Sequence, residues 1–119
     1  MANITLRDFY DMVGGSYEDV VGRLMKEDRI VKYLNKFKDS SDYDQMIEAI
    51  ETKEWETVFR MSHNLKGMCQ NLGLDSLARV SSDLCEQVRH GAPAVDISTY
   101  VEAVADEYAK NIGAINLLN

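Results

Sequence analysis

The stretch from Trp55 to Leu72 constrains the fold of this 119-residue chain more than any other. Apolar or small side chains recur in it at steps of three and four residues, the spacing that places them on one face of an α-helix. These side chains are Trp55, Val58, Ser62, Leu65, Cys69 and Leu72. Because a helix with one apolar face is stable only when that face is covered, other helices are expected to pack against it.

Helical patterns also fill most of the remaining chain. Short N-terminal helices are expected within about residues 5–25, because Thr5 with Asp8 and Ser16 with Asp19 have the spacing of helix-capping pairs. Longer helices are expected to form a bundle over about residues 28–118, beginning near residues 28, 41, 54, 75 and 96.

Breaks between these helices have local signals. The apolar phase shifts at Ser40-Ser41, which predicts a break there, with Ser41 and Asp44 as the cap of the new start. Asp75 is expected to cap the helix that follows the central one. This second helix is expected to run to about His90, where Gly91-Ala92-Pro93 ends it. No segment combines strand alternation with turn chemistry. We therefore expect a single all-α domain over residues 1–119, an antiparallel four-helix bundle with one or two additional short N-terminal helices.

Composition excludes several classes of function. The net charge is −7 and the chain has no basic cluster, so nucleic-acid binding is not expected. There is no apolar run of the ~20 residues that a membrane span needs, and Met1-Ala2-Asn3 does not begin a secretory leader, which together predict a cytoplasmic protein. The two cysteines lack metal-ligand spacing, so we expect free thiols and no metal site.

His63 is the candidate reactive residue. On the central helix it points about 160° away from Leu65, and therefore towards water. Lys66 and Gly67 lie one turn further on. An uncrowded imidazole beside a cation suits a nucleophile that receives an anionic group. From spacing alone, an ordinary surface histidine, a solvated lysine and a packing notch at Gly67 remain equally good interpretations.

The run His63-Asn64-Leu65-Lys66-Gly67, with Gly73 six residues after Gly67, resembles the signature of histidine-containing phosphotransfer (HPt) domains. This resemblance implies that His63 accepts a phosphoryl group, through its Nε2 atom, from the aspartyl phosphate of a receiver domain and passes it to another receiver aspartate. Lys66 would then offset the charge of the phosphoryl group, and Gly67 would give it access.

The resemblance also implies the partners. These are response-regulator receiver domains, a hybrid histidine kinase that carries one, or both, with the chain itself a monomer. The sequence contains no nucleotide-binding pattern and no acidic triad for Mg²⁺, so we expect a phosphoryl carrier without kinase machinery. It would have no cofactor of its own, and Mg²⁺ would be held by the receiver.

The residues around the histidine depart from the family pattern. The short turn at Gly73 places Cys85 level with His63 and Ser82 level with Lys66. HPt domains often have glutamine or glutamate at the Cys85 position, where it hydrogen-bonds the imidazole, and a thiol is a weak substitute. Gln70 is a candidate replacement, although a solvated surface amide is an equally good interpretation; Glu86 is a weaker candidate.

Candidate partner-binding residues are Phe59, Arg60, Phe9 and Tyr10. A place in the core is the favoured alternative for Phe9 and an equal one for Tyr10. Two rival functions remain: a non-phosphorylated helical adaptor that only binds a receiver, and an enzyme that uses a cysteine with a histidine. The second histidine, His90, is interpreted as structural, at a helix end.

Overall fold

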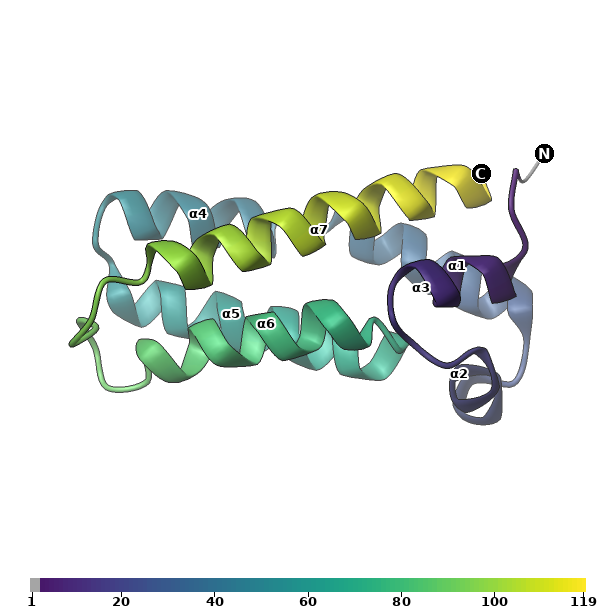
Figure 1. Cartoon of the computed structure of the whole chain (residues 1–119), viewed down its shortest axis with the longest axis horizontal. Helices are drawn as coiled ribbons and strands as arrows, with labels where there is room; N and C mark the ends of the chain where they lie inside the picture. Colours follow the sequence, from purple (N-terminus) through teal and green to yellow (C-terminus); the bar gives the residue numbers. More distant parts are fainter. Residues whose placement is uncertain (1–2) are drawn as a thin grey trace.

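The computed structural model describes residues 3–119, within which the chain forms seven α-helices and no strand (Figure 1). The helices are α1 (Leu6–Met12), α2 (Tyr17–Leu24), α3 (Glu27–Asp39), α4 (Asp42–Glu51), α5 (Trp55–Leu72), α6 (Asp75–Gln87) and α7 (Ser98–Leu118).

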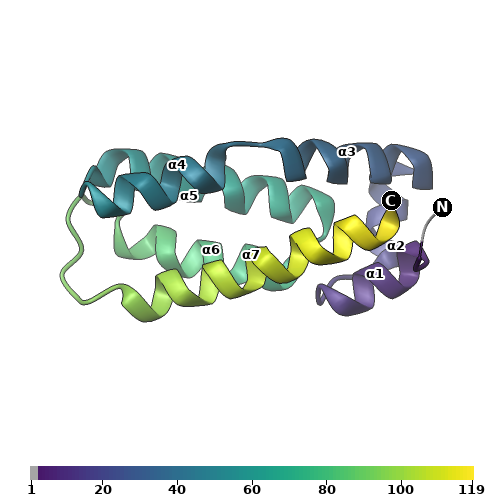
Figure 2. The same cartoon turned by 90° about the horizontal axis from the view of Figure 1, so that it is seen from above.

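The predicted antiparallel four-helix bundle with short N-terminal helices is confirmed. Helices α5 and α6 form a hairpin, α4 packs along α5, and α7 packs along α6. Tyr43 of α4 and Tyr108 of α7 stack with ring centroids 3.8 Å apart, which links the remaining side of the bundle. Helix α3 continues the line of α4 and packs on α5 and α7 (Figure 2).

The predicted break between α3 and α4 is confirmed, but its capping hydrogen bond differs. Helix α3 ends at Asp39 and α4 begins at Asp42. Ser40 Oγ accepts a hydrogen bond from the Asp42 N–H at 3.2 Å. Ser41 is the N-cap residue of α4, as predicted, but the expected hydrogen bond from the Asp44 N–H is absent, because the Ser41 hydroxyl accepts from the Gln45 side-chain amide at 2.7 Å.

The turn between α5 and α6 depends on Gly73. This residue has a left-handed backbone with φ of 73°, and the following Leu74 N–H donates to the Cys69 carbonyl at 2.9 Å. A Cβ atom at this position would lie 2.2 Å from Val20 Cγ2, so both the conformation and the space require glycine. Asp75 was expected to cap α6, but it is the first helical residue instead. There its negative charge interacts favourably with the positive end of the helix dipole.

Helices α1 and α2 lie at the end of the bundle where α5 turns into α6 (Figure 1). Thr5 and Asp8 form the predicted capping box, and the Ser16 hydroxyl accepts from the Asp19 N–H. Tyr10 is completely buried, and its hydroxyl donates to the Leu72 carbonyl at 2.7 Å. Burial also raises the pKa of that hydroxyl well above its usual range. Helix α1 is thereby fastened to the α5–α6 turn.

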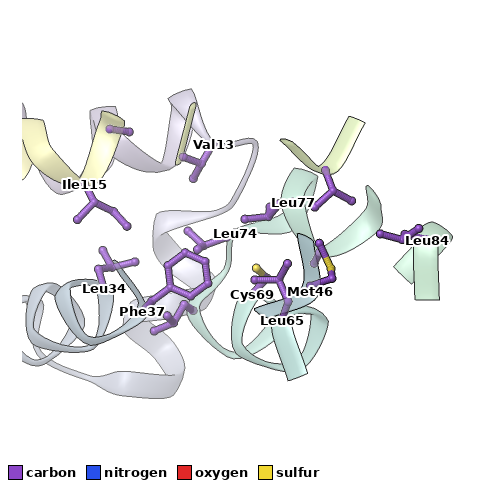
Figure 3. Packing of buried hydrophobic residues seen from close by; sticks show 14 of the residues in the cluster. Val13, Leu34, Phe37, Met46, Leu65, Cys69, Leu74, Leu77, Leu84 and Ile115 are labelled. Atoms are coloured by element: carbon purple, nitrogen blue, oxygen red, sulfur yellow. The ribbon is translucent and has the colours of Figure 1, made fainter. Parts of the chain in front are cut away.

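One continuous core joins these elements. Figure 3 shows Leu34 and Phe37 of α3 near Ile115 of α7, with Cys69, Leu65 and Met46 further along. Both cysteines are buried free thiols, as predicted. The ends of the last two helices differ from expectation: α6 ends at Gln87 rather than near His90, and α7 begins at Ser98. Asp96 precedes α7 and accepts from the Ser98 N–H at 2.9 Å.

Replacing Tyr10 with phenylalanine tests the attachment of α1. We expect Tyr10→Phe to lower the free energy of unfolding by about 1–2 kcal/mol, because the buried Leu72 carbonyl loses its donor. Urea unfolding followed by circular dichroism measures the change. Tyr100→Phe, at a half-buried tyrosine, is the matched control and should change stability by less than about 0.5 kcal/mol. Equal losses in the two variants would contradict the proposed anchoring bond.

Candidate functional site

His63 lies near the middle of α5, and its side chain is exposed. The buried residues of α5, among them Val58, Leu65 and Cys69, occupy the opposite face of the helix. Phe59 precedes the histidine by one turn, and the two ring centroids are 6.0 Å apart with a tilt of 31°. The helix periodicity therefore places the imidazole in water, with one aromatic neighbour.

Gly67 lies one turn after His63 and is also exposed. A Cβ atom built on it meets no atom within 4 Å outside its own stretch of helix. No neighbouring helix therefore needs the missing side chain, and the interpretation of Gly67 as a packing notch is wrong. A glycine inside a helix costs roughly 1 kcal/mol relative to alanine. What it provides here is open space beside the imidazole.

Lys66 is half-buried on the side of α5 that faces α6. Its charge reaches Glu86 of α6, since the pKa of that carboxyl is lowered mainly by its hydrogen bond with Arg89 and further by Lys66 and His90. Glu86 forms its ion pair with Arg89. Within residues 3–119, Lys66 forms no ion pair of its own. Its ammonium charge, on a residue one helical turn from the histidine, is thus not neutralised by an ion pair within those residues.

Cys85 does not hold the imidazole. It lies beside the α5 turn that carries His63, but it is buried and its Sγ atom lies 3.9 Å from the Phe59 carbonyl oxygen. Ser62 Oγ donates to the same carbonyl at 3.0 Å. The short thiol is used inside the α5–α6 interface, and no hydrogen bond joins it to His63. Ser82, half-buried on α6, forms no hydrogen bond through its hydroxyl with residues 3–119.

Gln70 does not hold the imidazole in place of Cys85. The Gln70 side chain is exposed and makes no hydrogen bond to His63, which lies about 10 Å away along the helix axis. Only the Gln70 main chain is engaged, because Arg23 of α2 donates to the carbonyls of Gln70 and Asn71 at 3.2 and 3.1 Å. Within the described part of the chain, the imidazole therefore has no hydrogen-bond partner.

The four candidate partner-binding residues separate into two pairs. Phe59 is half-buried and Arg60 is exposed, both next to His63. Phe9 and Tyr10 have no exposed surface, so the expectation that they present a docking surface is wrong. The physical reason is that α1 packs on α7 and on the Gly73 turn, about 15 Å along α5 from His63, where both rings complete the core.

Arg89 is a further neighbour of the site. Its guanidinium lies 5.8 Å from the centre of the Phe59 ring, so Phe59 has both a cation and the His63 ring as neighbours. The short α5–α6 turn predicts from sequence that Arg89 is level with Phe59, but not that its guanidinium reaches the ring. His90 is exposed just beyond the end of α6.

Two general features complete the description. No helix of residues 3–119 is long and apolar enough to cross a membrane. In the same residues, no group of three histidine, cysteine, aspartate or glutamate side chains is placed to hold a metal ion. The site is thus an exposed imidazole on a helix, bordered by Phe59, Lys66 and an empty flank at Gly67.

Comparison with known proteins adds the family. The family model of the Hpt domain matches residues 32–110, from the first half of α3 to the second half of α7. Comparisons with curated proteins and with solved structures give no match. The Hpt match spans more than half of the chain and includes the exposed His63. The chain therefore belongs to the Hpt domain family, whose members carry out histidine phosphotransfer in two-component phosphorelays.

Proposed function

We propose that this chain is a phosphorelay intermediate, which accepts a phosphoryl group on His63 from the aspartyl phosphate of one receiver domain and passes it to the aspartate of another. One observation carries the proposal: an exposed imidazole lies one turn before an exposed glycine whose missing side chain no other helix requires. Membership of the Hpt domain family supports the same chemistry.

The transfer step requires little of this chain beyond position. Nε2 of His63 attacks phosphorus with its lone pair, the bond to the aspartyl oxygen breaks, and the aspartate leaves as a carboxylate. The same step in reverse delivers the phosphoryl group to the next aspartate. Phosphoryl transfer depends mostly on positioning and charge stabilisation, which Mg²⁺ on the receiver would supply. Lys66 would offset part of the roughly two negative charges on the phosphorylated ring.

The two rival functions have less support. A non-phosphorylated adaptor does not require an unobstructed imidazole, nor the glycine beside it. An enzyme that pairs cysteine with histidine requires an accessible thiolate. Both thiols are buried, and burial raises the pKa of the Cys69 thiol well above its usual range. Phosphotransfer by His63 is therefore the function that the geometry supports best.

Labelling with a phosphorylated receiver tests this function. We expect wild-type chain, incubated with receiver domains that carry radiolabelled phosphate, to gain label that is lost in acid and kept in base. His63→Gln should gain none, because the nucleophilic nitrogen is absent. His90→Gln, at the other exposed histidine, should be labelled like the wild type. Label on His63→Gln, or none on the wild type, would remove the proposed function.

Lys66→Ala tests the role of charge. We expect transfer to His63 to slow by roughly tenfold, equal to about 1.4 kcal/mol, because the transferred group loses a neighbouring cation. Helix content should be unchanged. Rapid-quench kinetics measures the rate, with Lys110→Ala on the exposed surface of α7 as the control for loss of one positive charge. An equal slowing by both substitutions would show that only net charge matters.

Gly67→Gln tests access to the imidazole. We expect transfer to fall by more than about tenfold, because the new side chain fills the open flank, while the free energy of unfolding rises by up to about 1 kcal/mol through helix propensity. Gly113→Gln is matched, since Gly113 is also exposed, helical and without neighbours at its Cβ position, but lies on α7. It should stabilise the chain without affecting transfer. Unchanged kinetics in Gly67→Gln would contradict the access role.

A further inference from the structure

Nearly half of the basic residues of this acidic chain lie on α3 or shortly before it. Six of the thirteen lysines and arginines lie between residues 23 and 38, a stretch with only two of the twenty acidic residues. Four of these cations are exposed on α3 or at its N-terminal end and are here called the basic stripe: Lys26, Arg29, Lys32 and Lys36. The sequence expectation of no basic cluster is therefore wrong at the level of the folded surface. Helical spacing brings together cations that apolar residues separate along the chain.

The stripe borders a solvent-exposed hollow. Its members face away from Ile30, Leu34 and Phe37, which enter the core. A hollow of about 400 Å³ is lined by Lys26, Asp28, Arg29, Lys32 and Tyr33. Asp28 is the one acidic residue in this lining, and its carboxylate accepts a hydrogen bond from the Arg29 N–H at 3.0 Å. The hollow is thus predominantly cationic, with an aromatic side chain at its edge.

Tyr33 connects this hollow to the helix that carries His63. A second, more apolar hollow of about 190 Å³ lies between α3 and α5 and is lined by Tyr33, Lys36, Phe37, Met68, Asn71 and Leu72. Asn71 is about 12 Å from His63 along α5, and the exposed Gly67 lies between them. Arg23 adds a further cation here through its bonds to the Gln70 and Asn71 carbonyls. Gly67 and Asn71 of α5, then Tyr33 and Lys36 of α3, thus lie between His63 and the rest of the basic stripe.

The area that a docked protein covers indicates how far from His63 its contacts can reach towards the basic stripe. A standard interface covers about 800 Å² on each partner, a disc of about 16 Å radius. A receiver centred on His63 would therefore cover the second hollow and bring its edge to Lys36, the member of the stripe that lines this hollow. Charges at the edge of an interface act mainly on the rate of association and its salt dependence.

We propose, on the basis of the proposed function, that the basic stripe is an electrostatic docking edge for the acidic face of the receiver domain that exchanges phosphoryl groups with His63. The face of a protein that carries an aspartyl phosphate is anionic, because the phosphoryl group adds up to two negative charges and Mg²⁺ is held by further carboxylates. A cationic stripe beside the acceptor histidine complements that face. It also guides the donor into register before transfer.

A receiver fits this surface better than a nucleic acid does. The net charge of the whole chain is −7, which opposes the approach of an extended polyanion. The stripe continues into an apolar hollow and then to the reactive histidine, whereas phosphate-backbone recognition needs only the cations. Lys26 and Arg29 lie outside the residues that match the family model, whereas Lys32 and Lys36 lie within them.

A matched pair of double variants tests the proposal. Arg29→Glu with Lys32→Glu reverses the centre of the stripe. Lys38→Glu with Lys110→Glu makes the same change of charge elsewhere: Lys38 lies on the α7 side of α3, where it contacts Asn116, and Lys110 is exposed on α7. The donors are receiver domains from the same organism, phosphorylated with acetyl phosphate and Mg²⁺. The second-order rate constant for transfer to His63 is measured at about 0.01 M and 0.1 M salt, where the Debye lengths are about 30 and 10 Å.

We expect the stripe variant to react at least about tenfold more slowly than the control at low salt, with a smaller difference at high salt and an unchanged rate at saturating concentration. Thermal unfolding checks that both variants fold. If charge reversal unfolds the chain, Arg29→Gln with Lys32→Gln provides the same test, with a smaller expected decrease in the rate constant at low salt. Equal rate constants in the stripe and control variants would overturn the proposal while leaving phosphorylation of His63 in place.

Two other outcomes also decide against it. If the wild-type chain takes no label from any receiver, the proposed function and the docking edge both fail. Fluorescence anisotropy with a short labelled DNA duplex examines the competing partner. Binding of the duplex by the wild type and its loss in the stripe variant, with unchanged transfer kinetics, would identify the stripe as a nucleic-acid surface and overturn the proposal.

Discussion

The turn at Gly73 determines how the rest of the molecule presents its histidine. Its left-handed backbone reverses the chain within a few residues, and the space at its Cα is occupied by Val20. The reversal sets the register of α6 against α5, as the positions of Arg89 beside Phe59 and of Cys85 beside the Phe59 carbonyl show. With α6 on one flank of α5 and α4 on the other, the remaining face of α5 is left to solvent.

Because α4 and α6 hold α5 in place, the positions of the residues on its exposed face are fixed without any contact from their own side chains. The His63 imidazole forms no hydrogen bond within residues 3–119, and Phe59 is its aromatic neighbour there. Because neither ring nitrogen has a fixed partner, both neutral tautomers are available, and only one has its lone pair on Nε2. This reduces the reactive fraction by a factor of a few, roughly 1 kcal/mol or less in barrier. A carrier whose partner supplies the catalytic charge tolerates a loss of this size.

Periodicity predicted the bundle and the exposure of His63 because both follow from long helices with one apolar face. It failed where a single side chain decides the outcome. Helix α1 has only seven residues, too few to show which side is buried, and the Tyr10 bond to Leu72 could not be read from either local sequence. The turn predicted which residue of α5 lies beside Cys85, but it did not predict where the Cys85 side chain points. The short thiol is directed at the Phe59 carbonyl oxygen. Asp75 has a residue type common both at caps and in first turns, so type alone did not locate the cap of α6; at Ser41 it located the cap residue but not its hydrogen bond.

A count of charges along the sequence shows that basic residues are dense between residues 23 and 38, but not that four of them share one exposed face. Charge counted along a chain averages over faces, whereas a partner meets one face at a time. On α3 the core residues and the cations have the same three-and-four spacing, offset by part of a turn, so one helix contributes both to the core and to the surface around the second hollow. In the proposed function, the receiver would supply the metal and most of the stabilisation of the transferred group. The properties left to this chain would then be access to the imidazole, which Gly67 would provide, and the rate at which the right partner finds it, which a cationic edge on an otherwise acidic molecule would raise.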